Sequence, residues 1–230
     1  RRGAVTGILT NAGFEDIFEM GRYKRERSQM YSLEYDVPEP LVAKRRRKGV
    51  GGRMNAQGEE LHPLDEDAVR DAVHHLVDKQ GVKSIAVCYL HGYKNPAHEL
   101  RTAEIISDGW PDITVSISSD IVREYREYER TSTAVVNAYI QPIFRTYIGA
   151  LESNLADENF SGSFYITRSG GGALLARDAT DIPIHTIFSG PAGGLIGAAR
   201  LSELLDRPDI ISVDIGGTRT DACVVRGGTP

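Results

Sequence analysis

The sequence predicts an α/β fold in which helices pack against a mainly parallel sheet. Apolar residues recur at helical spacing between residues 65 and 81, and a continuous apolar run follows at 85–90. A second helical pattern begins at Pro96, and another strand pattern occupies 113–117. Alternating strand and helix patterns of this kind are typical of sheets covered by helices.

The overall composition is that of an ordinary soluble globular protein. Of its 230 residues, 40% are hydrophobic and 26% are charged, and the net charge is −5. An acidic balance provides no general field that attracts nucleic acid. The basic run 44–48 is an exception, and we expect a solvated loop or an exposed strand there rather than a nucleic-acid patch.

The two cysteines, Cys88 and Cys223, lie inside apolar runs, which predicts buried thiols without a disulfide and a cytoplasmic location. No apolar stretch approaches the roughly 20 residues of a membrane helix, so no membrane association is expected. The sequence begins in a strand pattern and ends just after a hairpin pattern, which predicts a piece of a longer polypeptide.

The first part of the chain reads as a buried strand at 4–10 and a short helix near 15–20. Residues 22–50 are irregular and charged, with an extended surface segment expected. Four glycines between 49 and 58 indicate turns.

The helix that follows has Asp65 as its expected N-cap and Gly81 as its expected C-terminal cap. The apolar run 85–90 is typical of a central strand that is buried on both faces. The helix that begins after Pro96 is expected to turn Ala103 and Ile106 towards the core.

A long helix is predicted from Thr131 to about Leu155, with a kink or interruption at Pro142. A strand at 164–167 follows it and ends in the loop 169–172, which is either a ligand loop or a flexible connection. The apolar stripe expected for the long helix consists of Val135, Val136, Tyr139, Ile140, Ile143, Phe144, Tyr147, Ile148 and Leu151.

A helix rich in small residues begins at Ser189, which is expected to cap it, with Pro191 in its first turn. Its glycines leave one face nearly bare. Two explanations remain open, an anion or nucleotide near the helix N-terminus and close packing against another element.

The hairpin at 211–225 contains the residues with the clearest chemical potential. Two apolar runs, expected to be buried strands, flank a Gly-Gly-Thr turn. Glycine allows a bulky anion to approach the backbone, while N–H groups and hydroxyls donate to phosphate oxygens. The alternative is a glycine-rich turn with capping carboxylates. The polar and glycine residues are Asp214, Gly216, Gly217, Thr218, Thr220 and Asp221.

Residues 214–221 resemble the Asp-x-Gly-Gly-Thr-x-Thr-Asp phosphate motif of the hydantoinase A/5-oxoprolinase family of actin-like ATPases. Three further stretches resemble the same family in the same order, at 86–99, 126–139 and 189–194. Arg219 stands where the family usually has a small residue, and Gly170 where it usually has asparagine.

The resemblance implies a partial ribonuclease H-like/actin-like ATPase fold, comprising most of lobe one and the first hairpin of lobe two. Residues 1–120 would form the α/β part of the first lobe. Residues 121–230 would begin the hydantoinase A domain, with the phosphate-loop hairpin at 211–225. The resemblance also implies a longer parent protein, with a first phosphate loop ahead of this segment and the nucleotide between two lobes.

The resemblance further implies that ATP and Mg²⁺ are used, with Asp214 and Asp221 as catalytic residues and Asp214 as the Mg²⁺ ligand. The residues that it assigns to the nucleotide and its phosphates are Gly216, Gly217, Thr218, Thr220, Ser189, Gly190, Gly193 and Gly194.

By resemblance, the parent enzyme is an ATP-dependent hydrolase of cyclic amides or imides such as hydantoin or 5-oxoproline. It would phosphorylate the lactam carbonyl so that water can attack. A partner subunit of the hydantoinase B type, or a homo-oligomer, is implied, and no nucleic acid is expected as a partner. The alternatives are an ATP-dependent ketone carboxylase subunit and a non-catalytic actin-like relative.

Two other groups of residues have competing explanations. His91, His98 and Glu99 form either a metal site or, as we expect, capping and packing contacts, because their spacing matches no compact zinc motif. The arginines at 123, 126 and 130 lie among glutamates at helical spacing. Ion pairs on a solvated helix explain them, and the alternative is a role in bridging two lobes or in binding a substrate carboxylate.

Overall fold

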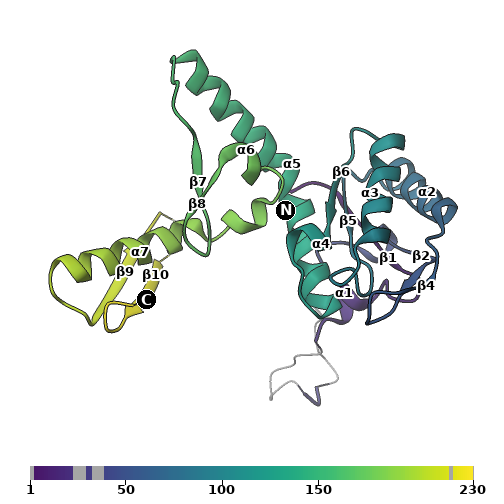
Figure 1. Cartoon of the computed structure of the whole chain (residues 1–230), viewed down its shortest axis with the longest axis horizontal. Coiled ribbons are helices and arrows are strands. Elements are labelled where there is room, and N and C mark those ends of the chain that lie inside the picture. The colour runs from purple at the N-terminus through teal and green to yellow at the C-terminus, as the bar shows by residue number, and fades with distance from the viewer. Residues whose placement is uncertain (1–2, 23–29, 33–38, 218–219, 230) are drawn as a thin grey trace. The chain divides into compact units, whose positions relative to one another are not determined.

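The computed structural model describes residues 3–22, 30–32, 39–217 and 220–229. The chain forms two compact units, Arg1–Ile143 and Phe144–Pro230 (Figure 1). In the described part of the chain, no helix has the length and apolar character needed to cross a membrane.

The first unit is built on a four-stranded parallel sheet with the strand order β2-β1-β5-β6. The strands are β1 (Thr6–Asn11), β2 (Arg47–Val50), β5 (Ser84–Val87) and β6 (Thr114–Ile117). Every residue of β1 and β5 is buried, as the continuous apolar runs predict. The strands predicted at 4–10, 85–90 and 113–117 are therefore confirmed, and β2 begins within the basic run, where a loop or an exposed strand was expected.

The helices of this unit begin and end close to the predicted residues. In α2 (Glu66–His74), the Asp65 carboxylate accepts a hydrogen bond from the Ala68 N–H at 2.9 Å. The chain continues through η3 (His75–Lys79) to Gly81, which has a φ of 63°. The next helix, α3 (Ala97–Gly109), follows Pro96. The core contains Leu9, Val50, Val69, Ala72, Val73, Leu76, Val82, Ile85, Val87, Tyr89, Ile105, Ile106, Ile113 and Ile117.

The basic run is only partly solvated, so its prediction is wrong for Arg47. After η2 (Lys44–Arg46), the chain enters β2 with the Arg47 side chain buried. Arg47 Nη1 lies 2.7 Å from Glu19 Oε2, and its Nε donates to the Val42 carbonyl at 3.0 Å. Glu19 belongs to the short helix α1 (Ile17–Met20), which was predicted. A counter-charge from this helix is what allows an arginine inside the sheet edge.

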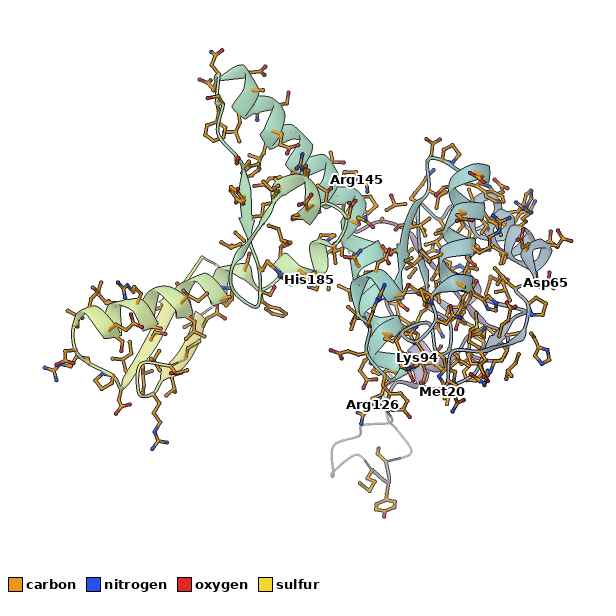
Figure 2. All side chains as sticks on the ribbon, in the orientation of Figure 1. Met20, Asp65, Lys94, Arg126, Arg145 and His185 are labelled. Carbon is orange, nitrogen blue, oxygen red and sulfur yellow. The ribbon has the colours of Figure 1, made fainter. Side chains whose placement is uncertain are left out.

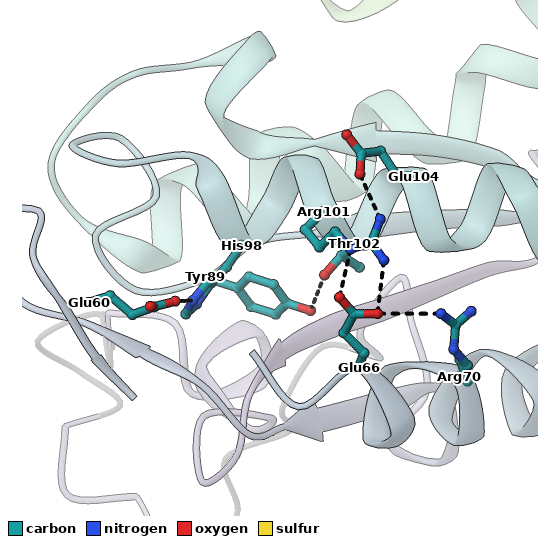
Figure 3. A network of polar contacts seen from close by, with 8 residues as sticks. All are labelled: Glu60, Glu66, Arg70, Tyr89, His98, Arg101, Thr102 and Glu104. Atoms are coloured by element: carbon teal, nitrogen blue, oxygen red, sulfur yellow. Dashed lines mark hydrogen bonds and ion pairs between the residues drawn. The ribbon is translucent and has the colours of Figure 1, made fainter. Parts of the chain in front are cut away.

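The glycine-rich segment after β2 folds into a small hairpin of β3 (Arg53–Met54) and β4 (Glu60–His62). His98 of α3 holds this hairpin, with its Nε2 lying 2.6 Å from Glu60 Oε1 (Figure 3). His98 is therefore a packing residue, as expected.

The carboxyl end of the sheet is closed by a buried ion pair between Arg130 and Glu99, which are each 1% exposed. Arg130 Nη2 lies 3.0 Å from Glu99 Oε1 and donates to the Tyr89 carbonyl at 2.8 Å. Glu99 also accepts hydrogen bonds from the Tyr89 N–H, the Ser118 hydroxyl and the Ser119 N–H, at 2.9, 2.7 and 2.8 Å. Arg130 thus joins the core rather than the solvated helix pairs predicted for it.

Helix α5 (Glu127–Asp157) begins four residues earlier than expected and continues through Pro142 without interruption. Its buried face also differs from the predicted stripe, because Ile143 is exposed whereas Asn137 and Gln141 are buried. Asn137 donates to Ser116 Oγ at 3.0 Å, and Ser116 donates to Gln141 Oε1 at 2.8 Å. The amide side chains of Asn137 and Gln141 are buried because they bond to Ser116 of β6, whereas a pattern of apolar residues alone predicts that polar side chains face solvent.

The second unit contains two hairpins and a helix rich in small residues. The loop predicted at 169–172 connects β7 to β8, and the hairpin predicted at 211–225 is present. The elements are β7 (Tyr165–Thr167), β8 (Ala173–Leu175), α6 (Ala176–Ala179), η4 (Pro183–Thr186), α7 (Ser189–Leu204), β9 (Ile210–Ile215) and β10 (Thr220–Val225).

The strands β9 and β10 are covered on one face only, so the prediction of two buried strands is wrong. Helix α7 packs on the hairpin, as the two lie together in Figure 1. The opposite face leaves Ile211 74% exposed and Ile215 76% exposed. Cys223 is only partly buried, unlike Cys88, and both thiols are free.

Candidate functional site

The hairpin β9–β10 places two carboxylates opposite each other. In the antiparallel register, Asp221 pairs with Asp214, and Cys223 pairs with Ser212. Because side chains alternate along a strand, these four residues share one face of the hairpin. This face looks onto α7 and forms part of a cavity of about 360 Å³. The cavity is lined by Pro191, Gly194, Leu195, Ala198, Ser212, Val213, Asp214, Asp221 and Cys223.

Gly194 of α7 lies directly against the Asp214 carboxylate. A Cβ atom built on Gly194 would be 3.0 Å from Asp214 Oδ2, which is closer than side chains normally pack. The same addition at Gly193 or Gly197 would meet no atom within 4 Å. The absence of a side chain at residue 194 is therefore what gives the Asp214 carboxylate its room.

Two carboxylates that lie directly opposite each other favour a cation beside them. Like charges that lie directly opposite in an antiparallel pair are destabilising. Magnesium is commonly held by one or two carboxylates together with substrate phosphates and water. Asp214 and Asp221 fit this ligand set. In the described part of the chain, no three His, Cys, Asp or Glu residues are arranged to hold a metal, so phosphate and water oxygens would have to complete the shell.

The turn between the two strands is only partly described. Gly216 and Gly217 are exposed, as the approach of an anion to their backbone requires. Thr220 is the first residue of β10 and pairs with Ile215. The predicted phosphate ligand Thr218 lies outside the described residues, and so does Arg219.

The start of α7 departs from the prediction in one respect. Ser189 is the first helical residue, and it does not cap the helix. The Phe188 N–H that precedes it instead donates to Ser169 Oγ at 2.9 Å. Since Ser169 lies in the β7–β8 loop, the serine that binds near the start of α7 comes from a distant part of the sequence. Gly190 and Gly193 are exposed on the helix surface.

Several lining residues were not among those predicted. Ser212 and Cys223 follow from period-two alternation, which continues from Asp214 and Asp221 along each strand. Leu195 and Ala198 lie one and four residues after Gly194 on α7, and helical spacing places them near its face. The alternation of side chains along the strands was a signal that could have identified Ser212 and Cys223. The residues that α7 contributes to the cavity could be identified only from the packed structure.

Changing Gly194 to alanine is expected to reduce any phosphate-releasing turnover that depends on Asp214 without unfolding the protein. The added methyl group would displace the Asp214 carboxylate by a few tenths of an ångström, and since a misplacement of about 1 Å can cost roughly a hundredfold in rate, a smaller loss is expected here. Alanine also favours the helix by about 0.5–1 kcal/mol relative to glycine, so thermal stability should not fall. Steady-state phosphate release measures the effect.

The matched control for that change is Gly197→Ala, on the same helix. Its methyl group would enter open space, so activity should be retained. Equal activity of the two variants would contradict the role given to the close approach at Gly194.

The metal alternative for His91, His98 and Glu99 is wrong. His98 is bound to Glu60, and Glu99 is bound to Arg130. Burial lowers the pKa of His91, and the charges of Arg53 and Arg130 lower it further. A neutral imidazole is therefore expected at His91 at neutral pH.

Comparisons with known proteins agree with this geometry. The hydantoinase/oxoprolinase N-terminal region matches residues 1–109, and the hydantoinase/oxoprolinase model matches residues 130–230. The chain is 36% identical to an uncharacterized protein of Methanocaldococcus jannaschii over 97% of its length. It is 32% identical over 98% of its length to the acetophenone carboxylase gamma subunit of Aromatoleum aromaticum.

A solved structure extends the comparison to the fold. The ATP-dependent caprolactamase from Pseudomonas jessenii superposes with a TM-score of 0.85 at 29% identity, over 96% of this chain and 32% of that one. The chain likewise spans 32% of each of the two relatives named above, about a third of their length. The partial actin-like α/β fold is confirmed, and the chain belongs to the hydantoinase/oxoprolinase family.

Proposed function

We propose that this chain is part of an ATP-dependent hydrolase that opens a cyclic amide or imide. The observation that carries the proposal is the pair Asp214 and Asp221, which face each other across the hairpin beside Gly194. A cavity of about 360 Å³ adjoins them, within the size range of small-molecule sites. The ATP-dependent caprolactamase, whose name describes opening of a lactam, has the same fold over this region.

The residues of the hairpin have distinct roles in this proposal. Asp214 holds Mg²⁺, and Asp221 supports it from the facing strand. The N–H groups of Gly216 and Gly217 and the hydroxyls of Thr218 and Thr220 bind phosphate oxygens. When bound, the metal neutralises charge on the phosphate oxygens. Catalysis of phosphoryl transfer is mostly positioning and electrostatic stabilisation, which such a loop supplies.

The proposed reaction proceeds in three balanced steps. An electron pair of the amide carbonyl oxygen attacks the γ-phosphorus of ATP, and the bond from that phosphorus to the ADP oxygen breaks. Water then adds to the activated carbon, the ring C–N bond breaks as the nitrogen takes a proton, and an acyl phosphate remains. A second water adds to the acyl carbon and the bond from that carbon to the phosphate oxygen breaks, so one ATP and two waters yield ADP, phosphate and the opened acid. The amide, whose nitrogen otherwise leaves poorly, is activated at its carbonyl.

A second candidate is an ATP-dependent ketone carboxylase subunit. The observation that favours it is the 32% identity to the acetophenone carboxylase gamma subunit. In such an enzyme an enol oxygen, rather than an amide oxygen, would attack the phosphorus. A partner subunit is proposed for either reaction, because several relatives are named as subunits.

Phosphate release by the whole protein with its partner subunit tests the proposal. Hydantoin, 5-oxoproline and caprolactam are compared with acetone and acetophenone, the ketones being supplied with bicarbonate. We expect a cyclic amide to stimulate ATP hydrolysis and to be opened. Stimulation by a ketone alone would establish the carboxylase candidate, and stimulation by none of the compounds would overturn both reactions.

A further inference from the structure

A second cavity lies in the first unit, at the start of α5. Its volume is about 370 Å³, and it belongs entirely to residues of that unit. Two arginines, two glutamates and a tyrosine line it: Arg22, Tyr125, Arg126, Glu127 and Glu129. This set offers a small polar ligand charges of both signs and one aromatic ring.

Two of the four charges in this cavity satisfy each other. Arg22 Nε donates to Glu129 Oε1 at 2.8 Å, and its Nη2 donates to Glu129 Oε2. This fork-to-fork arrangement lowers the pKa of Glu129 through the hydrogen bonds from Arg22. Arg126 and Glu127 remain as the charges available to a ligand.

Figure 2 labels Arg126 in the first unit. Its charge acts on the nearby Glu129 carboxylate, but no hydrogen bond or ion pair joins its guanidinium to another described residue. Its backbone has a φ of 94°, which side-chain-bearing residues rarely adopt and which costs on the order of 1–3 kcal/mol. Glycine would occupy this position without strain. An arginine here is thus unfavourable for the backbone, and within the described residues its guanidinium is not held by a hydrogen bond or an ion pair.

Aromatic contacts fix the wall of the cavity beside Arg126. The rings of Tyr125 and Tyr93 meet edge to face, with centroids 6.1 Å apart and an interplanar angle of 83°. The guanidinium of Arg130 lies 5.6 Å from the centroid of the Tyr93 ring. The buried Arg130–Glu99 pair therefore anchors Tyr93, and Tyr93 in turn contacts the exposed ring of Tyr125.

We propose that this cavity binds a small planar oxyanion with a single negative charge, held by the guanidinium fork of Arg126 against the ring of Tyr125. Arginine matches the two oxygens of a carboxylate or bicarbonate in plane. The N-terminus of α5 adds favourable partial charge. Glu127 in the same cavity opposes phosphate dianions, since like charges in a site disfavour the wrong partner.

The source of the anion rests on the proposed function. A cyclic amide that bears a carboxylate, such as 5-oxoproline, supplies it in the hydrolase, and bicarbonate supplies it in the carboxylase. Both share the same planar chemistry. The cavity would then select carboxylate-bearing lactams over unsubstituted ones.

Binding to the full chain without ATP tests the site independently of turnover. Calorimetry or ligand-observed NMR is carried out with 5-oxoproline, 2-pyrrolidone, bicarbonate and inorganic phosphate. We expect 5-oxoproline or bicarbonate to bind more tightly than 2-pyrrolidone and phosphate. Arg126→Gly should weaken that binding at least about tenfold, because a charge-assisted hydrogen bond is lost. Its thermal midpoint should not fall, and Arg126→Lys should restore binding in part.

Asn159→Gly is the matched control, because it changes another residue with positive φ, 59°, in the other unit. Its binding should equal that of the unchanged chain. Unchanged binding in Arg126→Gly, preferential binding of phosphate, or no binding by either planar anion would overturn the inference. Oxyanion binding without any stimulated ATP hydrolysis would instead overturn the proposed function alone.

Discussion

Replacing Asp214 with asparagine is expected to abolish ATP-dependent turnover of the whole protein while leaving the hairpin folded. The neutral side chain keeps its shape, yet it loses the charge that would bind Mg²⁺ beside the substrate phosphates. Loss of one preorganised electrostatic contact typically costs about 10²–10³ in rate. Phosphate release at saturating ATP, with the substrate that stimulates it most, provides the measurement.

The thermal midpoint distinguishes this role from a structural one. Because Asp214 and Asp221 face each other, neutralising Asp214 relieves a repulsion of about 0.2–1 kcal/mol. Asp214→Asn should therefore lose activity without losing stability. The control is Asp209→Asn, since Asp209 Oδ1 accepts a hydrogen bond from the Gly227 N–H at 2.9 Å and fixes the hairpin base. That variant should lose stability and retain turnover, and full activity of Asp214→Asn would contradict the proposed site.

Much of the first unit could be predicted because its elements are locally encoded. The caps at Asp65 and Gly81 and the apolar run of β5 each depend on neighbouring residues. The burial of Arg47 in β2 was missed because an arginine becomes acceptable in the sheet edge only when Glu19 reaches it from α1. Such a contact between distant residues leaves no periodic trace in the sequence.

The candidate site likewise has features that the sequence predicted and features that it did not. The carboxylates and glycines of the hairpin were predicted from their spacing, and the structure brings Gly194 to Asp214 as a helix with small residues permits. The cap at Ser189 was wrong because Ser169, from another hairpin, binds the Phe188 N–H instead. The exposed face of β9 and β10 was also missed, because apolar content alone does not reveal which face a helix covers.

Breaking the Glu99–Arg130 pair is expected to have the largest effect on stability. Removing one partner of a buried ion pair costs about 3–5 kcal/mol, because the remaining charge is left uncompensated. Glu99→Gln and Arg130→Met should each lower the unfolding midpoint of the first unit by on the order of 10 °C for a chain of this size. The sequence has one tryptophan, Trp110 in that unit, so its fluorescence reports the transition.

The surface pair Glu66–Arg101 is the matched control. Its side chains are exposed and lie 2.7 Å apart between α2 and α3, also in the first unit (Figure 3). Exposed pairs typically contribute about 0.2–1 kcal/mol, so Glu66→Gln should change the Trp110 transition little.

The double variant of Glu99 and Arg130 separates charge from hydrogen bonding. It leaves no lone buried charge, so its cost should be smaller than the sum of the two single costs. A residual cost is expected, because the Tyr89 and Ser119 N–H groups lose their charged acceptor and the Tyr89 carbonyl loses its donor. Additive costs, or single changes below about 1 kcal/mol, would show that this cluster contributes no more than a surface pair. If the double variant costs less than the sum of the two single variants, the buried pair is the main link between the end of β5, helix α3 and the start of α5. The pair then also supports the Tyr93 and Tyr125 rings beside Arg126.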